Sequence, residues 1–325
     1  MQIQSSDAPS AEQLDNLSLW DRLRNLPQYL LPQRLITRTV YKLTRITKPW
    51  FKNTLIRTFI RHYRVDMSEA AEPNPLCYND FNHFFTRPLR NGSRPLATGD
   101  QVICCPVDGI VSQAGELADD FLLQAKGHVF SLNQLLGGTT SRALPFRGGS
   151  FATLYLAPRD YHRIHMPLAG QLREMVHIPG KLFSVSPLTT RIIPGLFARN
   201  ERVVACFDTA AGPMALVLVG AINVASIETV WAGTITPPLA TLCQHWDYPK
   251  SGSAAIHLEK GTEMGRFNMG STVIVLFAKQ AVRWDPTVKA AAHVRMGQKL
   301  GEIVAMQNFQ QEHSSLLQRK RHHLL

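Results

Sequence analysis

Long apolar runs are missing from this sequence of 325 residues, and none approaches the roughly 20 residues that a membrane-spanning helix needs. The best candidate, residues 214–227, is interrupted by Gly220, Asn223 and Ser226. The N-terminal residues also lack the basic-then-apolar order of a secretory signal peptide. We therefore expect an intracellular protein that does not span a membrane.

Cysteine is scarce, and its spacing does not suggest pairing. The five cysteines are an odd number, and no two of them form a Cys-x-x-Cys motif. A disulfide framework or a structural zinc site is therefore not expected, and a reducing compartment fits best. Hydrophobic residues make up 45% of the chain and charged residues 18%, which excludes a disordered or fibrous protein.

Acidic residues are almost absent from one segment, residues 18–64. This segment holds eleven Lys or Arg and a single acid, Asp21, so it carries +10 of the formal net charge of +11. The rest of the chain is nearly neutral. The basic residues are Arg22, Arg24, Arg34, Arg38, Lys42, Arg45, Lys48, Lys52, Arg57, Arg61 and Arg64.

Apolar residues recur at helical spacing within this basic segment. We predict helices over 17–26, over 34–48 and after Pro49, separated by prolines. Basic amphipathic helices suit an anionic lipid surface. The alternative is a helical hairpin whose basic side faces water. Nucleic acid is not an expected partner, because the remaining chain supplies no basic groove and no known reader motif.

Beyond about residue 66, short apolar runs alternate with Gly and Pro turns, which is typical of strands. Only 68–89 and 131–137 look helical there. The pattern predicts an α+β protein, with a basic helical N-terminal segment followed by a β-rich core. Segments 106–117 and 294–304 each join a Gly turn to a strand and resemble the hairpins of lipoyl carrier domains. No Lys occupies the tip of 106–117, so a carrier function is not supported.

Residues that could react together stand in separate segments. Asp108 lies in a Pro-Val-Asp-Gly turn, His162 and His165 lie close to a strand end, and Ser271 follows Gly270 before an apolar run. An Asp can orient a His that activates a Ser. From spacing alone, these residues fit equally well as a turn cap, two hydrogen-bonded histidines and a loop serine.

Two other kinds of site are weaker candidates. His162 and His165 could share a face as metal ligands, but no nearby carboxylate or cysteine completes a set, so no metal is expected. Ser271 also lacks the Gly-x-Ser-x-Gly elbow of the α/β-hydrolases.

Six motifs occur in a fixed order: PVDG (106–109), YHRIHMP (161–167), FSVSPLT (183–189), VGAINVASIETVW (219–231), KGTEMGRFNMGST (260–272) and VRMGQ (294–298). Together they resemble the bacterial, pyruvoyl-dependent phosphatidylserine decarboxylases over most of residues 65–305. One departure is Met269, where the family usually has Leu. Met conserves the volume of Leu, so the departure changes little.

The resemblance implies a chain that cleaves itself. Ser271 would attack the carbonyl of Gly270 to form an ester, and elimination would then break the chain and turn Ser271 into a pyruvoyl group. The products would be a β chain of residues 1–270 and an α chain of residues 271–325. A glycine at 270 fits because a Cβ there would crowd the tetrahedral intermediate.

The resemblance also implies roles for the partner residues. His165 would be the general base towards Ser271, and Asp108 would fix its tautomer. In the mature enzyme the pyruvoyl group would accept the electrons left when CO2 departs. His162 is our candidate for the acid that protonates Cα, a task that His165 could share. Ser184 is a candidate contact for the lipid headgroup.

The implied substrate is phosphatidylserine and the implied product phosphatidylethanolamine, at an anionic membrane surface. The α and β chains of one precursor would form a protomer, and two protomers a homodimer. The expected location is peripheral, on the cytoplasmic face of the inner membrane. We expect four parts: a flexible N-terminus (1–16), membrane-docking helices (17–66), a catalytic core (67–305) and a C-terminal tail (306–325).

Three alternatives stay open at this stage. A serine hydrolase could use Asp108, His165 and Ser271 without cleaving its own chain. A membrane-binding module without enzymatic activity could contain the same motifs in a purely structural role. A decarboxylase could act on another lipid with a serine headgroup.

Overall fold

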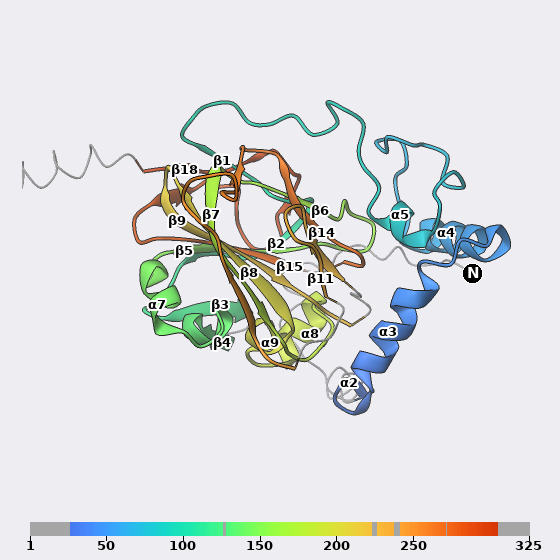
Figure 1. Cartoon of the computed structure of the whole chain (residues 1–325), viewed down its shortest axis with the longest axis horizontal. Coiled ribbons are helices and arrows are strands. Elements are labelled where there is room, and N and C mark those ends of the chain that lie inside the picture. The colour runs from blue at the N-terminus through green and yellow to red at the C-terminus, as the bar shows by residue number, and fades with distance from the viewer. Residues whose placement is uncertain (1–26, 126–127, 223–225, 237–240, 271, 305–325) are drawn as a thin grey trace, which may run out of the picture.

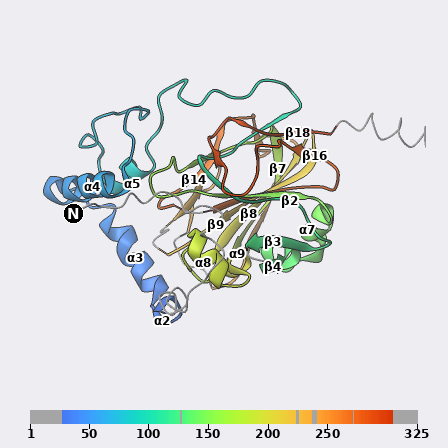
Figure 2. The ribbon, with the colours of Figure 1, turned by 180° about the vertical axis from the view of Figure 1, so that it is seen from behind.

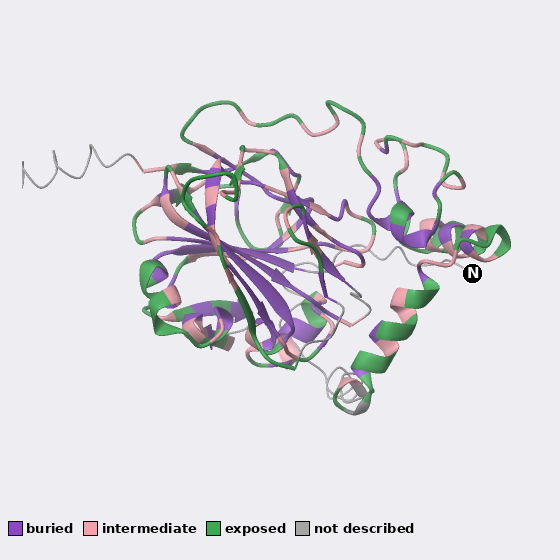
Figure 3. Ribbon diagram, in the orientation of Figure 1, coloured by how far each residue is buried: buried purple, intermediate pink, exposed green. Residues whose placement is uncertain are grey.

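The computed structural model describes residues 27–125, 128–222, 226–236, 241–270 and 272–304. It has a helical N-terminal arm that projects beside a sheet-rich core (Figure 1). The sheet strands are buried along most of their length, whereas the arm exposes much of its surface (Figure 3). The predicted order of helical segment and β-rich core is confirmed. The helix predicted over 17–26 lies outside the described residues.

The described part of the arm contains α2 (Pro27–Leu30), α3 (Gln33–Leu43) and α4 (Pro49–Tyr63). Pro49 occupies the first turn of α4, where its missing N–H leaves no helical hydrogen bond unmade. The helix predicted over 34–48 ends earlier than expected, at Leu43, and the residue before Pro49, Lys48, is outside the helical region with a ψ of 120°. Helix α4 ends at Tyr63, and its C-cap Arg64 has a left-handed φ of 53°.

An aromatic cluster attaches α4 to the core. Phe59 of α4 meets three rings of α5 (Phe81–Phe85) at centroid separations of 5.0, 5.8 and 6.1 Å. Ile56 is fully buried in the same cluster, and Met269 of the core packs against it. The arm is therefore held by an apolar contact that reaches the residue before Gly270.

Among the described residues, nine strands form the largest sheet, in the order β12-β7-β8-β9-β15-β5-β2-β17, with β13 also paired to β7. All of these pairings are antiparallel. Their bounds are Gln244–Asp247, Gly170–Ile178, Arg202–Thr209, Gly212–Val219, Thr272–Phe277, Ser150–Tyr155, Gly109–Glu116, His293–Val294 and, for β13, His257–Leu258. Strand β15 is buried throughout, which matches its continuous apolar sequence.

Smaller sheets complete the described core. One has the order β11-β10-β14-β6, with bounds Gly233–Thr236, Ile227–Thr229, Glu263–Phe267 and Arg163–His165. Another has the order β1-β18-β16, with bounds Val102–Cys104, Lys299–Ile303 and Val282–Trp284. A hairpin joins β3 (Phe121–Ala125) to β4 (His128–Ser131).

Short helices accompany this hairpin: α6 (Leu132–Leu135), α7 (Thr140–Ala143), the 3-10 turn η1 (Leu144–Phe146), α8 (Pro187–Ile192) and α9 (Leu196–Arg199). They lie along one side of the large sheet in both ribbon views (Figures 1 and 2). Helix α6 confirms the helix predicted within 131–137.

The helix predicted over 68–89 is wrong in its extent. Only Phe81–Phe85 is helical, and Asp80 caps it by accepting a hydrogen bond from the His83 N–H at 2.8 Å. Pro73 and Pro75 interrupt the helical pattern before this turn. Within the described ranges, no helix is both long enough and apolar enough to cross a bilayer.

The two segments that contain Gly turns, 106–117 and 294–304, lie close together because their strands belong to shared pairings. Strand β17 pairs with β2 through Val294 and Gly109, and β18 pairs with β1. The likeness of this arrangement to carrier-domain hairpins stays a resemblance. Its consequence for the site is that the Asp108 turn lies beside the segment from 294 onward.

Residues 268–270 lead out of β14 towards the start of β15. Thr272, the first residue of β15, pairs with Tyr155 of β5 on one side and Val219 of β9 on the other. Gly270 and Thr272 therefore lie where the chain leaves the four-stranded sheet and enters the large sheet.

Candidate active site

Gly270 lies directly against the imidazole of His162. A Cβ built on Gly270 would come within 2.8 Å of the His162 Cε1 and 3.5 Å of its Nδ1. Real Cβ contacts of 2.8 Å essentially never occur, so a larger residue would displace the ring or the loop. The sequence analysis explained Gly270 by the space that the reaction intermediate needs. The structure adds a second reason, because a side chain at 270 would already clash with His162 in the folded precursor.

His162 is fully buried and has one nitrogen without a partner. Its ring stacks on Phe85, with centroids 4.0 Å apart and planes inclined by 19°. The Nε2 lies 3.4 Å from the Pro158 carbonyl oxygen, which can only accept, so the proton belongs on Nε2. Among the described residues, the buried Nδ1 has no hydrogen-bond partner, and it lies on the side of Gly270.

Burial keeps the His162 imidazole uncharged. Desolvation, with the positive charge of Arg87 as a second cause, lowers the pKa of His162 to about 3. At neutral pH the ring is therefore a neutral base with a free lone pair. A negative charge bound next to it would raise this pKa, because it would stabilise the imidazolium.

His165 lies on β6, and both of its ring nitrogens have partners. Its Nδ1 donates to the Gly261 carbonyl at 2.8 Å, and its Nε2 lies 3.0 Å from the Tyr161 hydroxyl. Burial lowers the pKa of His165, so this ring is also neutral at pH 7. Its tautomer is therefore fixed by Gly261 rather than by Asp108.

Asp108 is buried and bonded to a different set of groups. Arg94 contacts both carboxylate oxygens, with its Nε 2.9 Å from Oδ1 and its Nη2 2.5 Å from Oδ2. The Met296 N–H donates to Oδ1 at 2.8 Å. The direct Asp108–His165 bond implied by the predicted roles is thus not formed in this structure. Tyr161 stands between the two, since it bonds to His165 and lines the same cavity as Asp108.

Ser271, the predicted nucleophile, lies outside the described residues. Its neighbours are placed: Gly270 lies against His162, and Thr272 is fully buried in the sheet. Of the predicted site residues, the structure thus brings His162 and Gly270 together. Asp108 and His165 are bonded elsewhere.

A cavity of about 240 Å³ lies beside Gly270, and we call it the Gly270 cavity. Ser184 lines it, which agrees with a position near the headgroup. Its other described lining residues are Phe59, Tyr63, Phe85, Tyr155, Leu156, Pro158, Val185, Ser186, Ala221, Ile222 and Met269. The cavity is therefore mostly apolar, and helix α4 of the arm forms part of its wall.

Three residues of the site were missed by sequence reasoning. Phe85 stacks on His162, Tyr161 bonds to His165, and Arg94 holds Asp108. Tyr161 stands next to His162 in the YHRIHMP motif, which was a usable signal. Phe85 and Arg94 meet the site only through tertiary packing, so no local pattern marked them.

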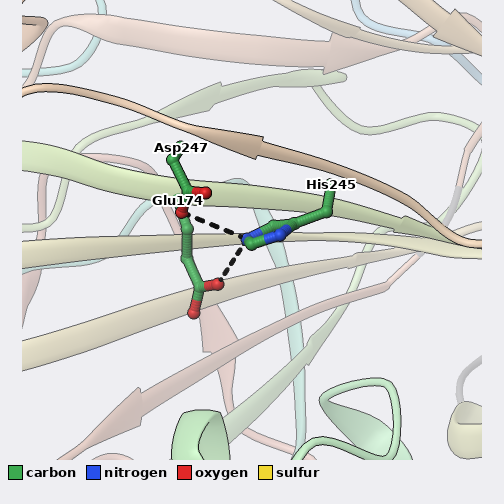
Figure 4. A group of neighbouring side chains, drawn as sticks. All are labelled: Glu174, His245 and Asp247. Atoms are coloured by element: carbon green, nitrogen blue, oxygen red, sulfur yellow. Dashed lines mark hydrogen bonds and ion pairs between the residues drawn. The ribbon is translucent and has the colours of Figure 1, made fainter.

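One group of three side chains in the described part of the chain has the spacing of metal ligands (Figure 4). The Nε2 of His245 lies 3.0 Å from Glu174 Oε2 and 3.3 Å from Asp247 Oδ1. Arg142 already donates to Glu174 at 3.0 Å. The group lies at the pairing of β12 with β7, shares no residue with the lining of the Gly270 cavity, and is explained by its ion pairs.

These features define a sheet-rich protein in which a buried, neutral histidine lies against the glycine of a Gly–Ser bond. A family model described as phosphatidylserine decarboxylase matches residues 81–302. A second model, described as PSD, matches residues 23–64, which is most of the basic segment.

Curated relatives carry the same name. The chain is similar to the phosphatidylserine decarboxylase proenzyme of Nitrosococcus oceani, with 56% identity over 88% of this chain and 93% of the relative. It is similar to those of Idiomarina loihiensis (52%; 87% and 97%) and Pseudomonas putida (54%; 87% and 98%). The chain belongs to the phosphatidylserine decarboxylase family.

Proposed function

We propose that this protein is a proenzyme that cleaves itself between Gly270 and Ser271 and then decarboxylates phosphatidylserine to phosphatidylethanolamine. The observation that carries the proposal is the contact of Gly270 with an uncharged His162 whose Nδ1 has no partner. The family membership of the chain supports the substrate and the self-processing.

In self-cleavage, the Oγ of Ser271 attacks the carbonyl carbon of Gly270. The peptide C–N bond breaks as the ester forms, and the hydroxyl proton passes by way of a base to the freed amine. Elimination then removes the Cα proton of Ser271 and breaks its Cβ–O bond, which leaves Gly270 with a free carboxylate and residue 271 as a dehydroalanine. Water then hydrolyses the imine tautomer of this residue, which releases ammonia and gives the pyruvoyl ketone. Two histidines are candidates for the base: the resemblance assigns His165, and the contact with Gly270 favours His162.

For His165 to act, its proton path must include Tyr161. The Tyr161 hydroxyl is 3.0 Å from His165 Nε2, and burial raises the pKa of Tyr161 to about 12. Tyr161 is therefore a neutral donor that can pass a proton but does not hold a charge. Asp108 would act on this pair through the field of its carboxylate, since its oxygens bond to Arg94 and Met296.

The surroundings fit a pyruvoyl group at residue 271. The group would supply an electron sink for the pair of electrons left when CO2 departs. The largely apolar lining of the Gly270 cavity offers few polar side chains that would hold water beside such a centre. In this proposal His162 returns a proton to the substrate carbon, and a bound anion would support that role by raising its low pKa.

Substrate is proposed to enter from the side of the arm. Phe59 and Tyr63 of α4 line the Gly270 cavity, and α3 and α4 expose large apolar residues beside basic ones. Trp50 is 75% exposed and Leu35 is 63% exposed. This pattern supports peripheral docking on an anionic membrane, so that acyl chains stay in lipid while the headgroup reaches Gly270. A homodimer of processed protomers is also proposed from the resemblance.

The test compares wild type with Ser271→Ala in the release of CO2 from phosphatidylserine vesicles. We expect activity in wild type and none in the variant, whose chain cannot form the ester. An active Ser271→Ala protein would overturn the proposed mechanism. Wild-type protein that processes itself and turns over only a different serine-headed lipid would overturn the proposed substrate.

A further inference from the structure

The Gly270 cavity contains no cation for the phosphate of its proposed substrate. None of its described lining residues is Lys, Arg or His. A phosphodiester carries a full negative charge, and burying it without a partner is costly. The cationic contact must therefore lie just outside this cavity.

Two lining residues of the Gly270 cavity are followed in the chain by arginines. Tyr63 and Pro158 line it, and the next residues, Arg64 and Arg159, line a neighbouring cavity of about 330 Å³. Arg87 lines that second cavity as well, and we call it the arginine cavity. The two cavities are thus lined by neighbouring residues of the same two stretches of chain.

The acids of the arginine cavity are mostly engaged with other groups. Asp108 and Glu69 both bond to Arg94, and Glu69 also pairs with Arg295 at 3.0 Å. Asp160 accepts a hydrogen bond from the Ala157 N–H at 2.7 Å. Asp66 accepts one from the Ser68 N–H at 2.8 Å.

Among the described residues, three of the five arginines that line this cavity, Arg64, Arg87 and Arg159, make no ion pair within 4 Å. Arg64 and Arg159 are exposed and free to move towards a ligand. Arg87 is only 3% exposed, and one of its nitrogens donates to the Arg159 carbonyl at 3.3 Å. The described lining holds five arginines against the four acids, so its formal charge is +1, and a ligand with negative charge would meet three arginines that form no ion pair.

A comparison with another buried arginine shows that Arg87 is unusual. Arg202 is equally buried, and its Nε, Nη1 and Nη2 all donate to backbone carbonyls at 2.5–2.7 Å. In the part of the chain that the structure describes, the Nε and Nη1 of Arg87 have no hydrogen-bond partner. A buried guanidinium with open donors gains more from a nearby anion than a saturated one does.

We propose that the arginine cavity binds the phosphodiester of the lipid substrate, with Arg64 and Arg159 contacting its oxygens and Arg87 supplying charge from beneath. The inference rests on the proposed function and adds the site that holds the headgroup. Planar guanidinium groups suit phosphate because they offer paired donors. The serine part of the headgroup then extends into the Gly270 cavity.

The experiment uses the processed full-length protein and a short-chain phosphatidylserine below its micelle concentration, so that no bilayer contributes. Arg159→Gln and Arg64→Gln should each raise KM about tenfold, the size of one lost charge-assisted hydrogen bond, with kcat little changed. Arg283→Gln is the control, because Arg283 is exposed on β16 and lines neither cavity. Its KM should equal that of wild type.

Two inhibitors separate the possible sources of the anion. Glycerophosphoethanolamine has the phosphodiester but no carboxylate, so it should inhibit wild type and lose potency in Arg159→Gln. Inorganic phosphate should compete with substrate at the same site. If phosphate inhibition depends on Arg159 while KM for the lipid does not, the cavity takes free phosphate and the proposal fails.

Failure of the inference is distinguishable from failure of the proposed function. Intact mass reports whether each variant still cleaves itself, and we expect complete cleavage in all of them. An active, processed wild type with unchanged KM in both arginine variants would contradict only the phosphodiester site. An uncleaved wild type would contradict the proposed function itself.

Discussion

The core wall and the arm wall of the Gly270 cavity differ in what they expose. Behind the core wall, His162 is fully buried against Gly270, and the strand that follows Ser271 is paired on both sides. On the arm wall, α4 contributes two aromatic residues while Trp50 faces outward. The comparison separates two tasks: the rigid wall positions the reacting bond, and the exposed wall meets the lipid. Substitutions on the two walls should therefore fail in different assays.

The largest effect is expected from Gly270→Ala on the core wall. Its new methyl group would meet His162 Cε1 at 2.8 Å, so the loop must shift and self-cleavage should stop. Gly92→Ala is the control, since its Cβ has no neighbour within 4 Å and its φ of 82° costs only about 1–2 kcal/mol in stability. Denaturing mass spectrometry should show an uncleaved Gly270→Ala chain and a cleaved Gly92→Ala chain.

The next effect separates the two histidines. His162→Gln should lower the rate of decarboxylation by about 100-fold or more, as expected for loss of general acid–base catalysis. His165→Gln should act mainly on the rate of self-cleavage. Both rates can be followed in one sample by intact mass and CO2 release. If both rates in His162→Gln equalled those of wild type, His162 would have no catalytic role.

A smaller effect is expected on the arm wall. Arg38→Glu with Lys42→Glu changes two exposed residues of α3, and each basic residue near an anionic surface contributes about 1 kcal/mol. Binding to phosphatidylserine vesicles should weaken at least tenfold, and added salt should weaken wild type too. Arg45 is left unchanged in this variant, because its guanidinium lies 3.5 Å from the centroid of the Tyr41 ring.

The matched control for this variant reverses two exposed charges of the core, Arg283→Glu with Lys289→Glu. The control should bind vesicles as wild type does, and both variants should turn over a short-chain substrate normally. If neither the α3 substitutions nor added salt changed vesicle binding, α3 would be a helix that faces water and does not dock on the membrane.

The smallest effect concerns stability and pH. Burial lowers the folded-state pKa of His162 to about 3, while the unfolded value is near 6.5, so the unfolded chain binds the extra proton between these values. The contribution of His162 to stability is therefore present above pH 6.5 and is lost as the pH falls towards 3. Urea unfolding at pH 7.5 and 5.0 should show a smaller loss of stability in His162→Gln than in wild type. Equal losses would contradict a buried, neutral His162.

Local patterns predicted much of the fold and part of the site. Helical periodicity bounded by prolines located α3 and α4, and apolar runs between turns located the strands. The segment 68–89 failed because its apolar spacing looked helical while its prolines prevented a helix. The surroundings of Asp108 and His165 could not be predicted, because Arg94 and Gly261 reach them from distant parts of the chain.

The mass of the purified wild-type chain under denaturing conditions tests the central claim most directly. Cleavage at Gly270–Ser271 predicts two fragments, residues 1–270 and residues 271–325, with the smaller one blocked at its N-terminus by a pyruvoyl group. A single full-length chain that keeps Ser271 intact and still decarboxylates phosphatidylserine would contradict the account.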